Sequence, residues 1–155
     1  MGSPSNPSGG ASANSAMFAR NFMAGDRATR RVLEDLMERL KQAGVGGDDL
    51  ATIELILAEA LNNVVEHAYA DAPGQVELSV ERLQSGLSCR ISDTGRPMPD
   101  GDAPDPPLPV IAPPTDIPEG GFGWHIIRCL TTDLTYCRDG PRNTLSMLVP
   151  LSDLD

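Results

Sequence analysis

The chain has 155 residues, the usual length of one domain, and its 40% hydrophobic content is sufficient for a buried core. Its formal net charge of −10 argues against direct nucleic-acid binding, because phosphate binding needs clustered cations. Lys41 is its only lysine and no G-x-x-x-x-G-K-[ST] occurs, which excludes a P-loop nucleotide site.

The N-terminal part of the chain predicts a tail, a strand and a helix. Residues 1–15 carry no charge and are rich in Ser, Gly, Asn and Pro, which is typical of a disordered tail. The apolar stretch 16–24 is a candidate first strand. Residues 26–43 follow with helical spacing, with Asp26 as the expected N-cap and glycines at the end. The apolar stripe of this helix consists of Val32, Leu33, Leu36, Met37, Leu40 and Ala43.

Residues 48–70 form a second predicted helix, capped by Asp48 or Asp49. Glu59 and Asn63 lie one turn apart on its polar side. A carboxylate and a carboxamide at this spacing can hold a hydrated divalent cation and orient an attacking hydroxyl or water. An isolated E-x-x-x-N is more often a solvated polar face, so the pair gains meaning only from the other motifs. The opposite side is apolar: Ile53, Leu57, Ala60, Leu61, Val64 and Ala68.

A hairpin and a long loop come next. Residues 75–83 alternate between polar and apolar side chains, which predicts a half-buried strand, and 87–92 form the expected return strand. Residues 97–118 contain nine of the fourteen prolines and neither Lys nor Arg. Long proline-rich segments inside a compact domain are typical of functional loops, and we expect 100–118 to be mobile without a ligand.

The C-terminal part predicts a short helix and two strands. Residues 120–123 (GGFG) precede an apolar helix from Trp124 to about Leu130, and strands are expected at 133–137 and 144–150. The order β-α-α-β-β-loop-α-β-β predicts an α+β fold. We expect a two-layer α/β sandwich, with one mostly antiparallel sheet covered by helices on one face.

Three further motifs carry groups suited to a ligand. Asp93 leaves a buried strand and can accept a directional hydrogen bond, while Gly95 permits close approach of the backbone to a flat ring. Gly120, Gly121 and Gly123 leave N–H groups open to an anion at a helix N-terminus. Asn143 and Thr144 enter the last strand with short polar side chains. Taken singly, the Asp93 motif is more typical of a plain turn, the glycine motif can be a flexible hinge, and Asn143-Thr144 has almost no predictive value.

The ordered set of motifs is more specific than its parts. EALNNVVEHAY (59–69), ISDTGRPMPD (91–100) and GGFGWHIIRCLTTDLTY (120–136) resemble the nucleotide-binding domain of the histidine-kinase-like (GHKL) ATPases. The resemblance is closest to the branch of anti-sigma-factor serine/threonine kinases and covers roughly residues 16–151. It implies a Bergerat-type ATP-binding fold in residues 16–155 that uses ATP and Mg2+, with 97–119 as the lid.

The resemblance also implies a role for each matching residue. Glu59 would be the general base that polarises a serine or threonine hydroxyl, and Asn63 would ligate Mg2+ at the ATP phosphates. Asp93 would accept the adenine amino group in a base pocket lined by Gly95. The phosphates and the remaining side of the adenine would be contacted by Gly121, Gly123 and Thr144.

The implied function is an ATP- and Mg2+-dependent serine/threonine protein kinase that acts as an anti-sigma factor or partner-switching regulator. Its substrate would be a STAS-type anti-sigma-factor antagonist, a sigma factor would be a further partner, and a homodimer is compatible with the family. Residues 97–127 contain no Lys or Arg, whereas the best-known sporulation branch carries both in its lid. The alternative is therefore a nucleotide-binding regulatory switch with little or no kinase activity.

The cysteines and the hydropathy indicate the compartment. Cys89, Cys129 and Cys137 are odd in number and lack C-x-x-C spacing, which indicates reduced, mostly buried thiols rather than a disulfide frame or a zinc site. No apolar run approaches the roughly 18 residues of a membrane span, and no signal peptide is visible. We expect a cytoplasmic protein without a membrane partner.

Overall fold

The computed structural model describes residues 16–99, 101, 103 and 122–152. The predictions for the tail, for most of the proline-rich loop and for Gly121 lie outside these residues.

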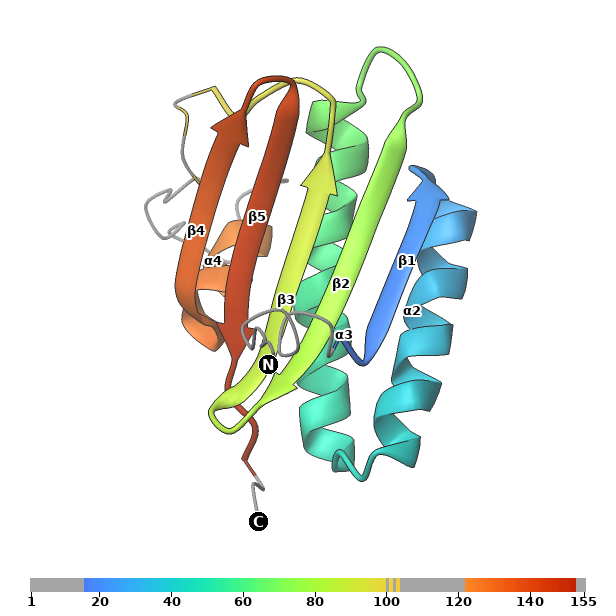
Figure 1. The fold of residues 1–155 in the computed structure, drawn as a ribbon, viewed down its shortest axis with the longest axis vertical. Coiled ribbons are helices and arrows are strands. Elements are labelled where there is room, and N and C mark those ends of the chain that lie inside the picture. Colours follow the sequence, from blue (N-terminus) through green and yellow to red (C-terminus); the bar gives the residue numbers. More distant parts are fainter. Residues whose placement is uncertain (1–15, 100, 102, 104–121, 153–155) are drawn as a thin grey trace, which may run out of the picture.

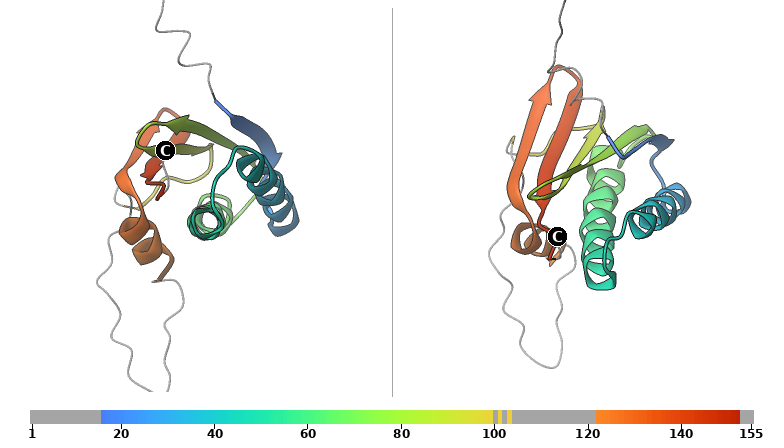
Figure 2. Two further views of the ribbon diagram at one scale, coloured as in Figure 1. Left: turned by 90° about the horizontal axis from the view of Figure 1, so that it is seen from below. Right: turned by 60° about the horizontal axis from the view of Figure 1, so that its bottom comes forward.

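The described residues form one sheet and a layer of helices on one of its faces (Figures 1 and 2). The sheet has the order β1-β2-β3-β5-β4 and all neighbouring strands are antiparallel, so the predicted α+β sandwich is confirmed. Its strands are β1 (Phe18–Met23), β2 (Gln75–Leu83), β3 (Gly86–Asp93), β4 (Thr132–Asp139) and β5 (Arg142–Val149). The helices are α2 (Asp26–Gln42), α3 (Gly47–Asn63), the π-helix η1 (Val64–Ala68) and α4 (Phe122–Leu130).

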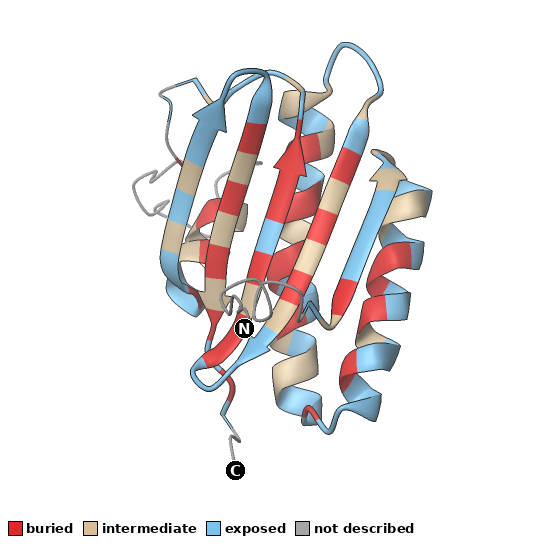
Figure 3. Ribbon diagram, in the orientation of Figure 1, coloured by how far each residue is buried: buried red, intermediate tan, exposed pale blue. Residues whose placement is uncertain are grey.

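The core lies between the sheet and the helices. Buried and partly exposed residues alternate along β2 and β5, because successive side chains of a strand point to opposite faces (Figure 3). The predicted alternation of β2 is confirmed, since Val76, Leu78 and Val80 are buried. The helices contribute fully buried residues from their predicted stripes, among them Leu36, Leu40, Ile53, Leu57 and Leu61.

The helix starts differ from the prediction. Asp26 is the first residue of α2 rather than its cap, and the caps of α2 and α3 are Gly25 and Gly46, without side-chain hydrogen bonds. Asp49 instead accepts hydrogen bonds from the backbone N (2.9 Å) and Oγ (2.8 Å) of Ser152. The acidic residue therefore ties the end of the chain to the first turn of α3, a use that local sequence does not reveal.

The second predicted helix is also not one regular α-helix. The α-helical part ends at Asn63, and η1 follows with a hydrogen bond from Tyr69 N to Val64 O (3.0 Å). A π-turn inserts one extra residue into the turn and is frequent at functional sites. Here it follows Asn63 directly and packs against the loop after β3, where the carbonyl of Ala68 accepts a hydrogen bond from Arg96 N (2.9 Å).

All three cysteines are free, as predicted, but only Cys89 is buried, whereas Cys129 and Cys137 are exposed. The expectation of mostly buried thiols is therefore wrong for two of them. Among the described residues, no helix is both long and apolar enough to cross a membrane.

The three thiols should differ in reactivity. Burial raises the pKa of Cys89 to about 12, so its thiolate is nearly absent at about pH 8, where exposed thiols are partly ionised. We expect Cys129 and Cys137 to react with a disulfide reagent within minutes, and Cys89 only after unfolding. Absorbance of the released thiol measures this, and Cys129→Ser is the control that should remove one fast equivalent. Rapid reaction of all three in the native protein would contradict the burial of Cys89.

Candidate functional site

The predicted ligand Asp93 lies at the end of β3, beside the start of β5. It is paired in register with Asn143, and both side chains are buried, at 8% and 2% exposure. Asn143 Nδ2 (2.8 Å) and Gly95 N (2.9 Å) both donate to Asp93 Oδ1. The described residues thus orient the carboxylate through one oxygen, and Oδ2 remains able to accept a hydrogen bond from a ligand.

Asn143 is the centre of a wider hydrogen-bond network. Its Oδ1 accepts from Tyr136 Oη (2.8 Å) and Arg138 Nη1 (2.9 Å), both on β4. Its Nδ2 also donates to the carbonyl oxygens of Gly95 (3.1 Å) and Arg96 (3.2 Å). A buried polar network in which each member is satisfied makes the local structure rigid. Asn143 therefore holds Asp93 and the following loop in place, a role that the sequence motif did not reveal.

Thr144, the predicted partner of the adenine, is not brought to Asp93. Its hydroxyl lies 3.2 Å from Ser92 Oγ, and both residues belong to the sheet face away from the helices. Neighbouring residues of a strand point to opposite faces, so Asn143 and Thr144 cannot both reach the Asp93 side. The structure places Asn143 there.

The loop of Gly95 packs directly against the end of η1. A Cβ at Gly95 would overlap the Ala68 carbonyl, so a side chain does not fit here. Tyr69 fastens the same loop, because its Oη accepts a hydrogen bond from Thr94 N (2.8 Å) and donates to Gln75 O (2.6 Å). The glycine predicted to admit a flat ring is thus required for contact between strand end and helix, and Tyr69 is a residue that sequence reasoning missed.

Asn63 and Asp93 line one small pocket, together with Met98, Tyr136 and Asn143. Its volume of about 20 Å³ is room for roughly one water molecule. The Nδ2 atom of Asn63 is buried and has no hydrogen-bond partner among the described residues. An unsatisfied buried amide costs roughly 1–3 kcal/mol, and such a group in a folded protein requires an explanation, such as a bound water, an ion or a role in the site. Rotation of the carboxamide would present its oxygen at the same place.

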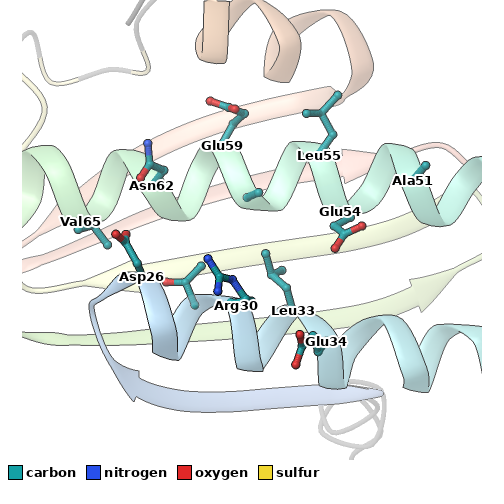
Figure 4. A pocket seen from close by; sticks show the side chains of 12 residues that line it. Asp26, Arg30, Leu33, Glu34, Ala51, Glu54, Leu55, Glu59, Asn62 and Val65 are labelled. Atoms are coloured by element: carbon teal, nitrogen blue, oxygen red, sulfur yellow. The ribbon is translucent and has the colours of Figure 1, made fainter.

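Glu59 lies one helical turn before Asn63 and points towards α4 (Figure 4). Its Oε1 would be 2.6 Å from a Cβ on Gly123, so the missing side chain of Gly123 makes room for the carboxylate at the start of α4. The structure thus pairs Asn63 with Asp93 and Glu59 with Gly123, at neighbouring places along α3. Gly121 lies outside the described residues.

Basic groups stand beside this pocket despite the acidic net charge. Arg96 lines it and forms an exposed ion pair with Asp71 (3.7 Å), and Arg138 Nη1 donates to Gly95 O (3.0 Å). Arg128 Nη2 donates to the Ala103 carbonyl (2.8 Å) at the start of the proline-rich loop. The described residues contain no cluster of three His, Cys, Asp or Glu side chains able to hold a metal.

Comparisons with known proteins agree with this geometry. A family model for the histidine kinase-like ATPase domain matches residues 22–149, a range that includes all four motifs. The serine-protein kinases RsbW of Bacillus cereus (strain AH820), Bacillus anthracis (strain CDC 684 / NRRL 3495) and Bacillus thuringiensis (strain Al Hakam) are similar to the chain. Each is 26% identical over 109 residues, which cover 65% of this chain and 68% of the relative.

Replacing Gly95 should destabilise the fold. We expect Gly95→Ala to lower the free energy of unfolding by about 1–3 kcal/mol, because the backbone of Ala68 has to move away from the added methyl group. Urea denaturation measures the change. Gly47→Ala is the control, since no atom lies within 4 Å of a Cβ there, and it should stay within about 0.5 kcal/mol. Equal effects of the two substitutions would contradict the packing described.

Asn143 and Thr144 are neighbours in the chain, but their replacement by Ala should lower the free energy of unfolding by different amounts. Asn143→Ala leaves Asp93 Oδ1 and Tyr136 Oη short of a partner, and we expect it to cost roughly 1–3 kcal/mol of unfolding free energy. Thr144→Ala loses only the contact with Ser92 and should cost less than about 1 kcal/mol. Thermal and urea unfolding of both variants check the order, which would be reversed if Thr144 were the residue that supports Asp93.

Proposed function

Since the chain belongs to the histidine kinase-like ATPase domain family, we propose that it is a protein kinase that transfers the γ-phosphate of ATP to a serine or threonine of a partner protein. The observation that carries the proposal is the pocket shared by Asn63 and Asp93. Among the described residues, it combines a carboxylate whose Oδ2 accepts no hydrogen bond with a buried amide that lacks a partner.

Asp93 is the residue that we propose recognises the adenine base. Its Oδ2 accepts a hydrogen bond from the adenine amino group, while Asn143 and Gly95 N hold Oδ1. Ligand pockets usually measure about 300–1,000 Å³, far more than this pocket offers. Binding must therefore displace the segment at Met98, whose backbone N donates to Tyr136 Oη (2.9 Å). A single hydrogen bond of this kind, worth about 1 kcal/mol, is readily replaced by contacts with the base.

Asn63 and Glu59 are the proposed phosphate end of the site. The carboxamide oxygen of Asn63 is a hard ligand that suits Mg2+, and the ion, when bound, neutralises charge on the phosphates. Glu59 accepts the proton of the substrate hydroxyl. The hydroxyl oxygen forms a bond to the γ-phosphorus, and the bond between this phosphorus and the oxygen of ADP breaks. We propose that the backbone N–H groups of Gly121 and Gly123 donate hydrogen bonds to the phosphates. For Gly123, the position at the start of α4 beside Glu59 supports this assignment.

The proposed substrate is a STAS-type anti-sigma-factor antagonist, with a sigma factor as the alternative partner and a homodimer as the acting form. The name serine-protein kinase of the relatives and the motif resemblance support this assignment. Phosphorylation adds a charge of about −1.5 to −2 to the partner. A chain with net charge −10 would repel the product electrostatically, which favours exchange of one partner for the other.

A second candidate is a nucleotide-responsive switch that binds ATP or ADP and transfers little phosphate. It is favoured by the absence of Lys and Arg from residues 97–127. Phosphoryl transfer depends on cations that offset charge in the transition state. The first candidate has to draw that charge from Mg2+, because Arg96 and Arg138 lie at the base end of the proposed site.

Replacing Asn63 should affect nucleotide binding and not lower the stability of the protein. Replacing it by Ala removes an unsatisfied buried donor, so we expect the unfolding free energy without nucleotide to stay equal or rise by up to about 1 kcal/mol. Binding of ATP with Mg2+, measured by calorimetry, should weaken by a factor of at least about 10. Asn62→Ala, on the exposed neighbour, is the control and should leave affinity unchanged. A destabilised Asn63→Ala protein with intact affinity would indicate a structural role instead.

Glu59 and Asp93 should separate transfer from binding. With radiolabelled ATP, Mg2+ and a STAS-type partner, we expect phosphoserine or phosphothreonine on the partner, and Glu59→Gln should slow its formation by about 10²–10⁴. Glu59→Gln should still bind ATP, whereas Asp93→Asn should not, and the exposed Glu38→Gln, outside both the pocket and the groove between α2 and α3, should behave like the wild type.

The outcomes divide the two candidates. Nucleotide binding that Asp93→Asn abolishes, without any transfer to the partner, would favour the switch over the kinase. Absence of binding of both ATP and ADP to the wild-type protein would contradict both candidates.

A further inference from the structure

A second, larger cavity lies on the outer side of the helices, away from the pocket of Asn63 and Asp93. It is an open groove of about 750 Å³ between α2 and α3 (Figure 4). Its walls include one large apolar side chain, Leu55, that is 42% exposed to solvent. The other apolar lining residues are Leu33, Ala51, Ala58 and Val65. Leu55 and these four residues together give the groove an apolar surface that a partner could cover.

The rim of the groove is acidic. Asp26 and Glu34 come from α2, Glu54 and Glu59 come from α3, and Arg30 is the only cation of the lining. Four carboxylates and one guanidinium give a formal charge of −3. The ion pairs that the described residues form with one another are Arg20–Asp35, Arg96–Asp71 and Arg142–Glu77, and none of them neutralises these carboxylates. The groove therefore offers apolar area between negative edges.

We propose that this groove docks a cationic amphipathic helix of a partner protein. Two helices packed side by side leave a straight furrow, and a third helix that lies in it completes a three-helix layer. The 17 residues of α2 span about 25 Å, enough to contact roughly four turns of a partner. The apolar stripe of that helix covers Leu55, and its flanking Lys or Arg side chains face the acidic edges.

The segments outside the described structure are unsuited to the groove. Residues 1–15, 104–121 and 153–155 lie outside the described structure, and none of these segments contains a Lys or Arg. These segments therefore do not match the charge of the groove, and a partner protein is the proposed source of the cationic helix. The basic residues of α2 in a second copy are a competing occupant, which the experiment has to distinguish.

The test uses a fluorescent amphipathic peptide of Leu and Lys, about four turns long, in anisotropy titrations without nucleotide. We expect saturable binding that weakens as salt screens the acidic edges. The variant Glu54→Lys with Leu55→Gln should bind at least ten times more weakly, because it changes two exposed residues of the groove. The control Glu81→Lys with Asp139→Lys makes a larger charge change outside the groove and should retain the affinity of the wild type.

Several outcomes would overturn the proposal. These are no binding of the Leu/Lys peptide, equal binding of a scrambled peptide of the same composition, and equal loss of affinity in the groove and control variants. A fourth is a wild-type dimer, detected by sedimentation, that the groove substitutions convert to a monomer, since the occupant would then be a second copy. The assay needs neither ATP nor phosphate transfer, so its failure leaves the proposed kinase activity untouched and is distinguishable from failure of that proposal.

Discussion

The site depends on the close contact between the loop at Gly95 and the carbonyl of Ala68. This contact sets how far the end of β3, which carries Asp93, lies from the helix that carries Asn63. The π-turn contributes to it, because the carbonyl of Ala68 accepts the hydrogen bond of Arg96 N. A side chain at Gly95 would separate the strand end from the helix, and Asn63 and Asp93 would no longer line one pocket.

Two buried amides in this region have opposite energetic roles. Asn143 satisfies both ends of its carboxamide and joins β3, β4 and β5. Asn63 is left with a buried donor that has no partner in the described part of the chain. The first amide stabilises the frame, whereas the second leaves a buried polar group uncompensated, a cost that the proposed ligand would offset.

Helix α3 serves three surfaces at once, and its sequence has to meet three demands. Ile53 and Leu57 face the core, Asn63 faces the proposed nucleotide pocket, and Glu54 and Leu55 line the outer groove. Glu59 stands where the last two surfaces meet, beside the start of α4. Since one rigid helix carries all of these groups, a partner in the groove and a nucleotide in the pocket would contact the same element.

The sequence alone was enough for the pattern of elements and for the order of the motifs, because alternation and helical stripes are local consequences of burial. The sequence predicted Asn63 and Asp93 as binding residues, and the fold brings both to one pocket. The choice between Asn143 and Thr144 needed the tertiary structure, since a strand shifted by one residue exchanges its faces and short polar residues do not reveal the register. The π-turn and the role of Asp49 also needed the tertiary structure. Asp49 binds Ser152, which lies about a hundred residues away in the chain, and the π-turn contacts the loop after β3. Such contacts between distant segments leave no local pattern in the sequence.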